Sequence, residues 1–406
     1  MTITNVKERS PLQIADLMDL RALSGKDINA ARGFEAMFQG RENGYNAAGD
    51  LITATSDGAP LGRMWAEFQK TISMWNSQRD PLTNLLTYNV SDIVESVRYP
   101  VEEDFQEASE YGEPTGIRLG TAYRMGYDFK WWDLALRYTW QFLADASSEQ
   151  LRALNNQALE ADNRLVFTRV MRAIFNSTTR VATIDGDAVN VYPFYNGDSI
   201  VPPKWKSTVH TSGHNHYLES GGTTVDPGDV QAMIDHLTHH GYTQSRGYRI
   251  LLMVNSQEGT TIRDFTKGTA SAKYTFIPGQ NYGGGVYIPA NGGLVGQPTL
   301  ANIPGLETIG SYGPATVIEE DYIPAGYMVM IVTAGEQNIG NPVGIRQHAN
   351  ASLQGLQLAK GKQSNEYPLI DSYYIHGMGT GIRHRGAGVV MEIGNGGTYT
   401  IPSAYA

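Results

Sequence analysis

The segment from Ser147 to Asn176 contains neither glycine nor proline, and it constrains the fold more than any other stretch. Ser147 and Gln150 have the spacing of a capping box at a helix start, and Glu149 places negative charge near the positive end of the helix dipole. A helix of this length is about 45 Å long at 1.5 Å per residue. The helix is then either one long helix within a large α+β domain or a rigid axis across which other layers lie. Apolar or small residues recur at close to helical spacing, at Leu151, Leu154, Ala158, Ala161, Leu165, Val166, Val170 and Ile174.

Composition excludes several kinds of site. The 406-residue chain has no cysteine, so disulfides, thiolate metal sites and cysteine nucleophiles are excluded. Its formal net charge of -10 does not provide a basic surface for gripping nucleic acid. The N-terminal sequence MTITNVKERSPLQ lacks the apolar core of a signal peptide, and no stretch approaches a membrane-spanning run. We expect synthesis in a cytosol and no membrane partner.

The chain changes character near residue 90. Residues 1–89 contain amphipathic helical stretches at 11–23 and 61–75 without an obvious local core. They predict an arm that packs on another surface, with a small helical domain as the alternative. Residues 90–130 predict two long strands joined by a polar, acidic segment. Because an isolated two-stranded hairpin is marginally stable in water, this hairpin needs a partner surface.

Downstream of the long helix, strands and helices alternate. Residues 181–226 predict an irregular region of short strands. Asp226 as N-cap, Pro227 in the first turn and Gly241 as a stop signal predict a helix between them. Further predicted elements are a buried strand at 248–255, a short helix at 260–268, two strands about a turn over 315–332, and strands at 381–393 and 397–402.

The order of these elements resembles the major capsid proteins of tailed bacteriophages, the HK97-fold family. Local sequences strengthen the resemblance: the approach to and run of the long helix at 143–176, YIPAGYMVMIV at 322–332, NPVGIRQH at 341–348, and PLIDSYYIHGMGTGIRHRGAGVVMEI at 368–393. The resemblance covers about residues 90–395. It implies an α+β fold of the HK97 type, in which the long helix is the spine helix.

The resemblance also implies a division of the chain into the parts of that fold. These are an N-terminal arm at 1–89, an extended E-loop hairpin at 90–130, a peripheral domain with the spine helix and an insertion at 131–221, an axial domain at 222–385 with strands that return to the peripheral domain, and a C-terminal strand and tail at 386–406.

The implied function is structural. Members of the family self-assemble into pentamers and hexamers of an icosahedral head that encloses double-stranded DNA, so the expected chain is a virion capsid protein made in the host bacterial cytoplasm, without enzymatic activity or cofactor. Its implied partners are its own copies, a portal protein, packaged DNA in non-specific proximity, and, as further candidates, separate scaffold and decoration proteins. An encapsulin-type compartment that holds enzyme cargo is the alternative with the same fold.

One departure from the family bears on how the shell is held. The founding member cross-links its shell covalently through a lysine on the E-loop, whereas the hairpin from Ser96 to Asp128 has arginines but no lysine, and Lys130 lies at its base. We therefore expect a shell without covalent cross-links. The charged residues expected to make assembly contacts are Glu102, Glu103, Asp104, Glu107, Glu110, Glu113, Arg118, Arg124, Arg346, Arg383 and Arg385.

Six histidines raise an alternative from a different class of function, a metal-dependent hydrolase. His214 with His216, and His236 with His239, each offer two potential ligands, yet no HExxH or other complete ligand motif is present. We expect solvated or hydrogen-bonded histidines and neither a metal site nor catalytic residues; an ion here would staple the insertion rather than catalyse. The full set is His210, His214, His216, His236, His239 and His240.

Two further patterns suggest chemistry and are interpreted as structural. Gly377, Gly379 and Gly381 resemble a phosphate loop, but the residues that follow predict a strand rather than a helix, so the helix N-terminus of an anion site is missing. We expect a glycine-rich turn at a strand junction instead. The acidic run at 319–321 is expected to form a solvated turn or to contact a basic residue such as Arg346.

Overall fold

The structure of the chain is a computed structural model, which describes residues 54–77, 80–98, 107–108, 110–112, 122–184, 186–269, 271–279, 306, 308–360 and 369–406. These residues form two compact units. Among the described residues, the first unit contains 54–71, 134–157, 358–360 and 369–374, and the second contains the remainder. The predicted helix at 11–23 lies outside the described residues. Among the described helices, none has the length and apolar character required to span a bilayer.

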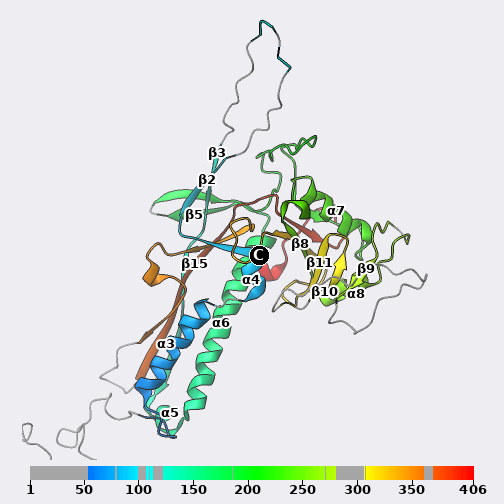
Figure 1. Cartoon of the computed structure of the whole chain (residues 1–406). Coiled ribbons are helices and arrows are strands. Elements are labelled where there is room, and N and C mark those ends of the chain that lie inside the picture. Colours follow the sequence, from blue (N-terminus) through cyan, green and yellow to red (C-terminus); the bar gives the residue numbers. More distant parts are fainter. Residues whose placement is uncertain are drawn as a thin grey trace, which may run out of the picture. The chain divides into compact units, whose positions relative to one another are not determined.

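The described part of the chain contains both helices and strands (Figure 1). The helices are α3 (Leu61–Ser77), α4 (Pro81–Leu86), α5 (Trp140–Asp145), α6 (Ser148–Phe175), α7 (Pro227–Thr238) and α8 (Ser256–Arg263). The strands are β1 (Thr87–Val90), β2 (Val94–Arg98), β3 (Ala122–Gly126), β4 (Lys130–Thr139), β5 (Arg180–Ile184), β6 (Asp187–Val191), β7 (Tyr217–Glu219), β8 (Arg249–Val254), β9 (Phe276–Pro278), β10 (Thr308–Tyr312), β11 (Ala315–Glu319), β12 (Tyr327–Thr333), β13 (Val343–Gln347), β14 (Leu356–Lys360), β15 (Leu369–Ile382) and β16 (Gly388–Glu392).

The long helix predicted from Ser147 to Asn176 is confirmed as α6. Its start carries the predicted capping box. The backbone N–H of Ser147 donates to Oε1 of Gln150 at 3.0 Å, and the backbone N–H of Gln150 donates to Oγ of Ser147 at 3.4 Å. Two backbone N–H groups at the helix start thereby find side-chain acceptors within four residues. Because the signal is local, this boundary can be predicted from the sequence.

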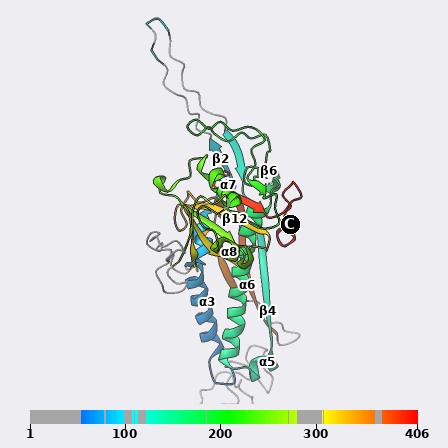
Figure 2. The same cartoon turned by 90° about the vertical axis from the view of Figure 1, so that its right-hand side faces the viewer.

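The first unit has a small apolar core. α3 runs alongside the N-terminal part of α6, as Figure 2 shows, and Arg152 of α6 pairs with Glu67 of α3 at 2.8 Å. This confirms the amphipathic helix predicted at 61–75. Its apolar face is buried against α5, α6 and the end of β4, in a cluster of Leu61, Met64, Phe68, Tyr138, Leu143 and Leu151.

The second unit contains a seven-stranded sheet in the order β7-β16-β12-β8-β11-β10-β9. The predicted strands at 315–332 are confirmed as β11 and β12, but they are not neighbours, because β8 lies between them. β8 is parallel to β11 and antiparallel to β12. The local turn at 324–326 therefore separates two strands of the sheet that do not pair with each other.

Both faces of this sheet are covered, and residues of β8 alternate between them. Ile250, Leu252 and Val254 pack with α7 and α8 in one cluster. Leu251 and Met253 pack with α4 and the C-terminal part of α6 in another. Figure 1 shows α7 and α8 beside the strands of this sheet. Burial on both faces explains why the strand reads as a continuous apolar run rather than an alternating one.

A second sheet carries the glycine pattern considered as a phosphate loop. Its order is β1-β13-β15-β14, and β4 also pairs with β15. Gly377, Gly379 and Gly381 lie within β15, so the glycine-rich turn expected at a strand junction is wrong, because these residues lie inside a long strand. A Cβ at Gly379 would overlap the backbone oxygen of Asp128. The glycine is thus required where two backbones approach closely.

The predicted hairpin begins with paired strands. β2 and β3 are antiparallel, with Val94 opposite Gly126 and Arg98 opposite Ala122. This confirms the strand pairing at the base of the hairpin. Between them, the described residues are 107–108 and 110–112.

The strand predicted at 397–402 is wrong: the structure has no strand in that range. Side-chain contacts hold the segment instead. The carboxylate of Glu392 accepts hydrogen bonds at 2.6 Å from both the backbone N–H and the Oγ1 of Thr400. The hydroxyl of Tyr399 donates to the backbone oxygen of Phe175 at 2.7 Å. Strand-like composition did not reveal that these residues bond to side chains and to a helix end rather than to a neighbouring strand.

The helix predicted after Asp226 is confirmed as α7, with Asp226 as N-cap. The backbone N–H of Asp229 donates to the Asp226 carboxylate at 2.9 Å, and the Asp229 carboxylate accepts from the N–H of Asp226 at 2.9 Å. Asp229 is nearly buried, and this burial raises the pKa of its carboxyl to about 6. The cap therefore places a titrating group inside the unit.

This raised pKa gives the first testable prediction. Between the ordinary Asp pKa of 3.8 and about 6, the folded chain binds more protons at Asp229 than the unfolded chain. The group therefore contributes stability below pH 3.8 that is lost as pH rises through 6. Asp229→Asn keeps the accepting oxygen and removes the charge. The thermal midpoint of Asp229→Asn relative to the unmodified protein should increase from about pH 4 to about pH 7, and a constant difference would contradict the assignment.

Candidate functional site

The predicted assembly contacts on the hairpin are described only in part. Glu107 and Glu110 are exposed, and Arg124 of β3 is exposed next to the hairpin base. Tyr111, beside these acids, is 93% exposed. As assembly contacts these residues stay predictions. Glu102, Glu103, Asp104, Glu113 and Arg118 lie outside the described residues.

The base of the hairpin is anchored by one carboxylate. Asp128 follows β3, and its Oδ2 accepts from Arg169 Nη2 and from Arg180 Nη1, each at 2.6 Å. Its Oδ1 accepts from the backbone N–H of Thr380 at 2.5 Å. Burial lowers the pKa of Arg169, and the charge of Asp128 opposes that shift. Sequence analysis missed this anchor, because its members are far apart in the chain and carry no motif.

Two of the predicted arginines make contacts within the second unit. Arg383 Nη2 lies 2.7 Å from Oε1 of Glu95 on β2, and both side chains are partly exposed. The guanidinium of Arg346 lies over the ring of Phe129, 5.0 Å from its centroid. The acidic run contributes a different pair from the one considered, since Glu319 accepts from Arg263 at 2.6 Å.

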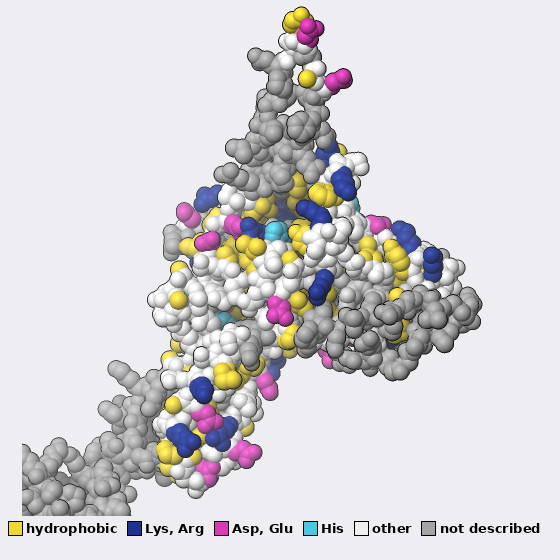
Figure 3. Space-filling model, viewed as in Figure 1, with side chains coloured by type: hydrophobic (Ala, Val, Ile, Leu, Met, Phe, Trp, Pro, Cys, Tyr) yellow, Lys and Arg dark blue, Asp and Glu magenta, His cyan; other side chains and the backbone are white. Residues whose placement is uncertain are grey.

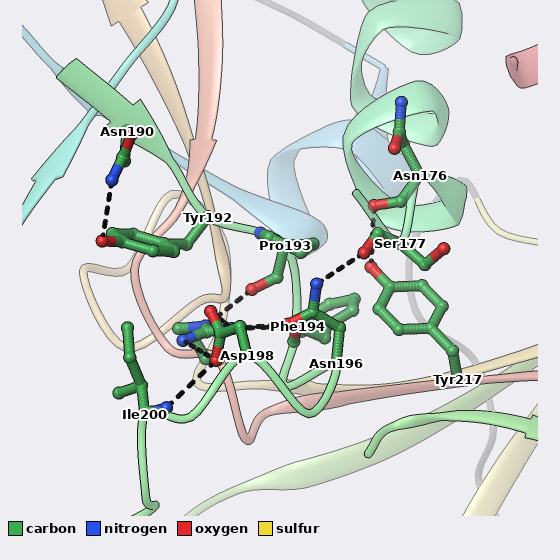
Figure 4. Close-up of polar contacts among 11 residues, drawn as sticks. Asn176, Ser177, Asn190, Tyr192, Pro193, Phe194, Asn196, Asp198, Ile200 and Tyr217 are labelled. Carbon is green, nitrogen blue, oxygen red and sulfur yellow. Dashed lines mark hydrogen bonds and ion pairs between the residues drawn. The ribbon is translucent and has the colours of Figure 1, made fainter. Parts of the chain in front are cut away.

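Arg385 is fully buried and bound by its own chain. Its Nε donates to the backbone oxygen of Pro193 at 2.8 Å, and its Nη2 donates to Asp198 at 2.9 Å. The guanidinium also lies over the rings of Tyr192 and Tyr195, at 5.0 Å and 4.7 Å. In Figure 4 the chain from Tyr192 turns back on itself towards Ile200, with Asp198 inside the turn. The arginine thus organises the turn at 192–200, and a direct intersubunit role for it stays a prediction.

Charges of both signs are mixed on the face shown in Figure 3. Lys and Arg side chains are interspersed with Asp and Glu among the residues that are coloured there. This distribution agrees with the low charged fraction of 18%. On that face, the described residues present no broad field of one sign that would attract a polyanion.

The histidine pairs that sequence analysis treated separately meet in one cluster. The Nε2 atoms of His214, His216 and His240 lie 2.9–3.0 Å from one another. His239 Nε2 lies 3.3 Å from that of His214. His210 stacks on His240, with ring centroids 4.3 Å apart. The loop between β6 and β7 and the C-terminal end of α7 supply the rings. More than 20 residues separate these two segments in the sequence, so motif analysis did not reveal the cluster.

The rings of this cluster are kept neutral by their surroundings. Burial lowers the pKa of His214 to about 3 and that of His239 to about 4, and repulsion from neighbouring rings acts in the same direction. Burial likewise lowers the pKa of His210, His216 and His240. Neutral imidazoles keep one nitrogen lone pair each, which is the form that can bind a metal. His210, His214, His239 and His240 place ligand atoms within 4.8 Å of one another.

Comparison with known proteins gives a strong similarity to a phage chain. The chain is similar to a solved chain of Mycobacterium phage Patience, with 42% sequence identity and a TM-score of 0.69. The match covers 90% of this chain and 97% of the phage chain. No family model matches the chain, and no curated protein matches it in sequence.

More distant solved structures resemble the chain weakly. The capsid chain of an empty GTA particle is 13% identical, with coverage of 77% of this chain and 90% of that chain and a TM-score of 0.44. The chain of an encapsulin complex from Synechococcus elongatus is 11% identical, with coverage of 79% and 89% and a TM-score of 0.43. At these values neither adds to the assignment.

Proposed function

This chain belongs to the HK97-fold family of tailed-bacteriophage major capsid proteins, and we propose that it assembles into the pentamers and hexamers of an icosahedral head around double-stranded DNA. That it is a structural capsid protein of the virion follows from the family. The observation that carries the proposal is the 42% identity to the phage chain over 97% of that chain's length.

The hairpin supports a reaching contact between copies of the chain. Its strands pair only with each other within the described sheets, and an isolated two-stranded ribbon is marginal in water. Tyr111 exposes an aromatic side chain beside the exposed Glu107 and Glu110. Aromatic side chains are enriched among the residues that carry binding energy at interfaces. A neighbouring subunit that covers this segment would bury Tyr111 and stabilise the ribbon.

The proposed shell is non-covalent, and its other partners follow the family. The hairpin from Ser96 to Asp128 contains no lysine to form an isopeptide cross-link. Many modest contacts, repeated at every subunit, hold such a shell by multivalency. We include a portal protein, separate scaffold and decoration proteins, and packaged DNA as proposed partners. Contact with the DNA is non-specific in this proposal, in keeping with the net charge of -10.

Deletion of residues 99–121, with β2 joined to β3 by a short Gly-Ser turn, tests the proposal. We expect the full chain, together with its scaffold if it needs one, to form closed shells visible by negative-stain electron microscopy. On a denaturing gel those shells should migrate as monomers. The deletion variant should stay a soluble subunit with the same unfolding transition but no shells. Normal shells from the deletion variant would exclude the hairpin as an essential contact.

A single substitution tests the contribution of Tyr111 separately from that of the paired hairpin strands. Tyr111→Ser should lower the yield of shells without lowering the thermal midpoint of the free subunit, because the side chain is 93% exposed and contributes little to the isolated fold. Ile339→Ser is the matched control, since it removes another exposed apolar side chain, 63% exposed, outside the hairpin. Equal losses of assembly in both variants would argue against a specific role for Tyr111.

A further inference from the structure

We propose that His214, His216, His239 and His240 bind one divalent transition-metal ion, of the zinc, cobalt, nickel or copper class, which fastens the loop between β6 and β7 to the C-terminal end of α7. The proposal concerns a structural site and is independent of the assembly proposed above. It replaces the expectation of simply solvated or hydrogen-bonded histidines.

The spacing of the ring nitrogens is that of a ligand set. Zinc binds histidine nitrogen at about 2.0–2.1 Å in tetrahedral geometry, which places ligand nitrogens about 3.3 Å apart. The Nε2 atoms of His214, His216 and His240 are 2.9–3.0 Å apart, and that of His239 is 3.3 Å from that of His214. Three nitrogens therefore converge on one point from two elements of the fold, and His239 offers a fourth nitrogen beside that of His214.

Hydrogen bonding alone cannot satisfy this arrangement. His216 Nδ1 lies 2.7 Å from the backbone oxygen of Gly388, which can only accept, so Nδ1 carries the proton and the Nε2 of the neutral ring is a bare lone pair. If the Nε2 of His240 is also unprotonated, its lone pair faces that of His216 Nε2. If the Nε2 atoms of His240 and His214 are both protonated, their two hydrogens face each other. If the Nε2 of His240 is protonated and that of His214 is not, the lone pairs of His214 and His216 face each other. A cation that accepts all the lone pairs removes the conflict.

The surrounding contacts resemble the support that metal-binding histidines receive. A ligating imidazole ordinarily donates its other N–H to a carbonyl or carboxylate, which fixes the ring and its tautomer. The fully buried His216 does so to Gly388. The buried Nε2 of His210, next to the cluster, has no hydrogen-bond partner among the described residues. His239 is the C-cap of α7, where the helix dipole favours a positive charge.

The donor set also restricts the ion and its role. Imidazole nitrogens suit zinc, copper, nickel and iron, whereas calcium and magnesium require oxygen ligands. Four protein ligands form a closed coordination shell, which is characteristic of structural rather than catalytic zinc. A link between His214 and His240 would close the loop against the helix, and such a clip stabilises by removing chain entropy. The loop already contacts the end of α7 through Trp205, which lies against Gly241.

The test uses the full chain without a polyhistidine tag. After exposure to zinc and dialysis, we expect one zinc ion per chain by elemental analysis. Chelation should lower the thermal midpoint, and zinc should restore it in a concentration-dependent manner. Cobalt in the same site should give the strong visible absorption of tetrahedral nitrogen coordination. A chain that retains no zinc, shows no cobalt spectrum and has an unchanged midpoint would overturn the proposal.

Two ligand variants and a matched control locate the site. His214→Gln and His240→Gln should each weaken zinc binding by more than the roughly 10- to 100-fold that loss of an outer-shell partner costs. His236→Gln should retain one ion, because His236 Nδ1 bonds to the backbone oxygen of Ala232 and its ring lies beside the cluster, 5.7 Å from that of His214. Zinc content unchanged in both ligand variants would contradict the site, and the cobalt spectrum of the unmodified chain decides the question if either variant fails to fold.

Discussion

Replacing Arg385 by methionine is expected to lower the free energy of unfolding of the second unit by about 3–5 kcal/mol. The guanidinium is completely buried, and its removal leaves Asp198 and the backbone oxygen of Pro193 without their charged donor. An unpaired carboxylate beside a buried cavity is among the most destabilising changes a single substitution can produce. Urea denaturation of the dissociated subunit measures the loss.

Arg383→Met is the control for this prediction. Arg383 lies two residues away and pairs with Glu95, but both side chains are about one quarter exposed. Because partly solvated ion pairs contribute little, the expected loss is about 0–1 kcal/mol. Similar losses of unfolding free energy in the two variants would mean that the buried Arg385–Asp198 pair contributes no more than an ordinary surface ion pair. If Arg385→Lys loses less free energy of unfolding than Arg385→Met, the positive charge contributes separately from the hydrogen bonds that the guanidinium group donates.

Asp128→Asn is expected to have an effect of similar size. The substitution removes the charge that faces Arg169 and Arg180, each 2.6 Å from Oδ2. Arg169 is buried, with 8% of its side chain exposed, so it would remain as an uncompensated cation. We expect a loss of about 3–5 kcal/mol in the free energy of unfolding, measured by urea denaturation of the subunit.

The same substitution has a consequence for assembly that stability alone does not capture. Asp128 fixes the base of the hairpin to β15 through Thr380, so its loss should also lower shell yield at temperatures where the variant is still folded. Glu67→Gln, which breaks the exposed pair with Arg152, is the matched carboxylate-to-amide control and should leave the thermal midpoint nearly unchanged. Asp128→Asn with an unaltered unfolding transition would show that the anchor is not energetically important.

Elements with local signals were predictable from the sequence. The start of α6 depends on Ser147 and Gln150, and that of α7 on Asp226 and Pro227, so a few adjacent residues determine each boundary. The insertion of β8 between β11 and β12 was not predictable in this way. Strand order depends on which apolar faces meet, and that choice is made by α4, α6, α7 and α8 together rather than by any turn sequence.

The candidate sites were less accessible to sequence reasoning, because they join distant residues. Arg385 has no local pattern that separates it from Arg383, yet one is enclosed by the turn at 192–200 and the other is partly solvated. The histidines were visible as two pairs, but their convergence depends on how the loop before β7 folds back on α7. Burial and long-range pairing, rather than residue type, decide what these side chains do.

The position of β16 has a consequence for the order of events during synthesis. Its residues, Gly388–Glu392, pair with β12 on one side and with β7 on the other, although β7 lies at Tyr217–Glu219. The sheet cannot be completed until β16 has left the ribosome, and pairing over such sequence distances is slow. A nascent chain that has not yet exposed Gly388–Glu392 therefore has β7 and the edge of β12 without their shared neighbour.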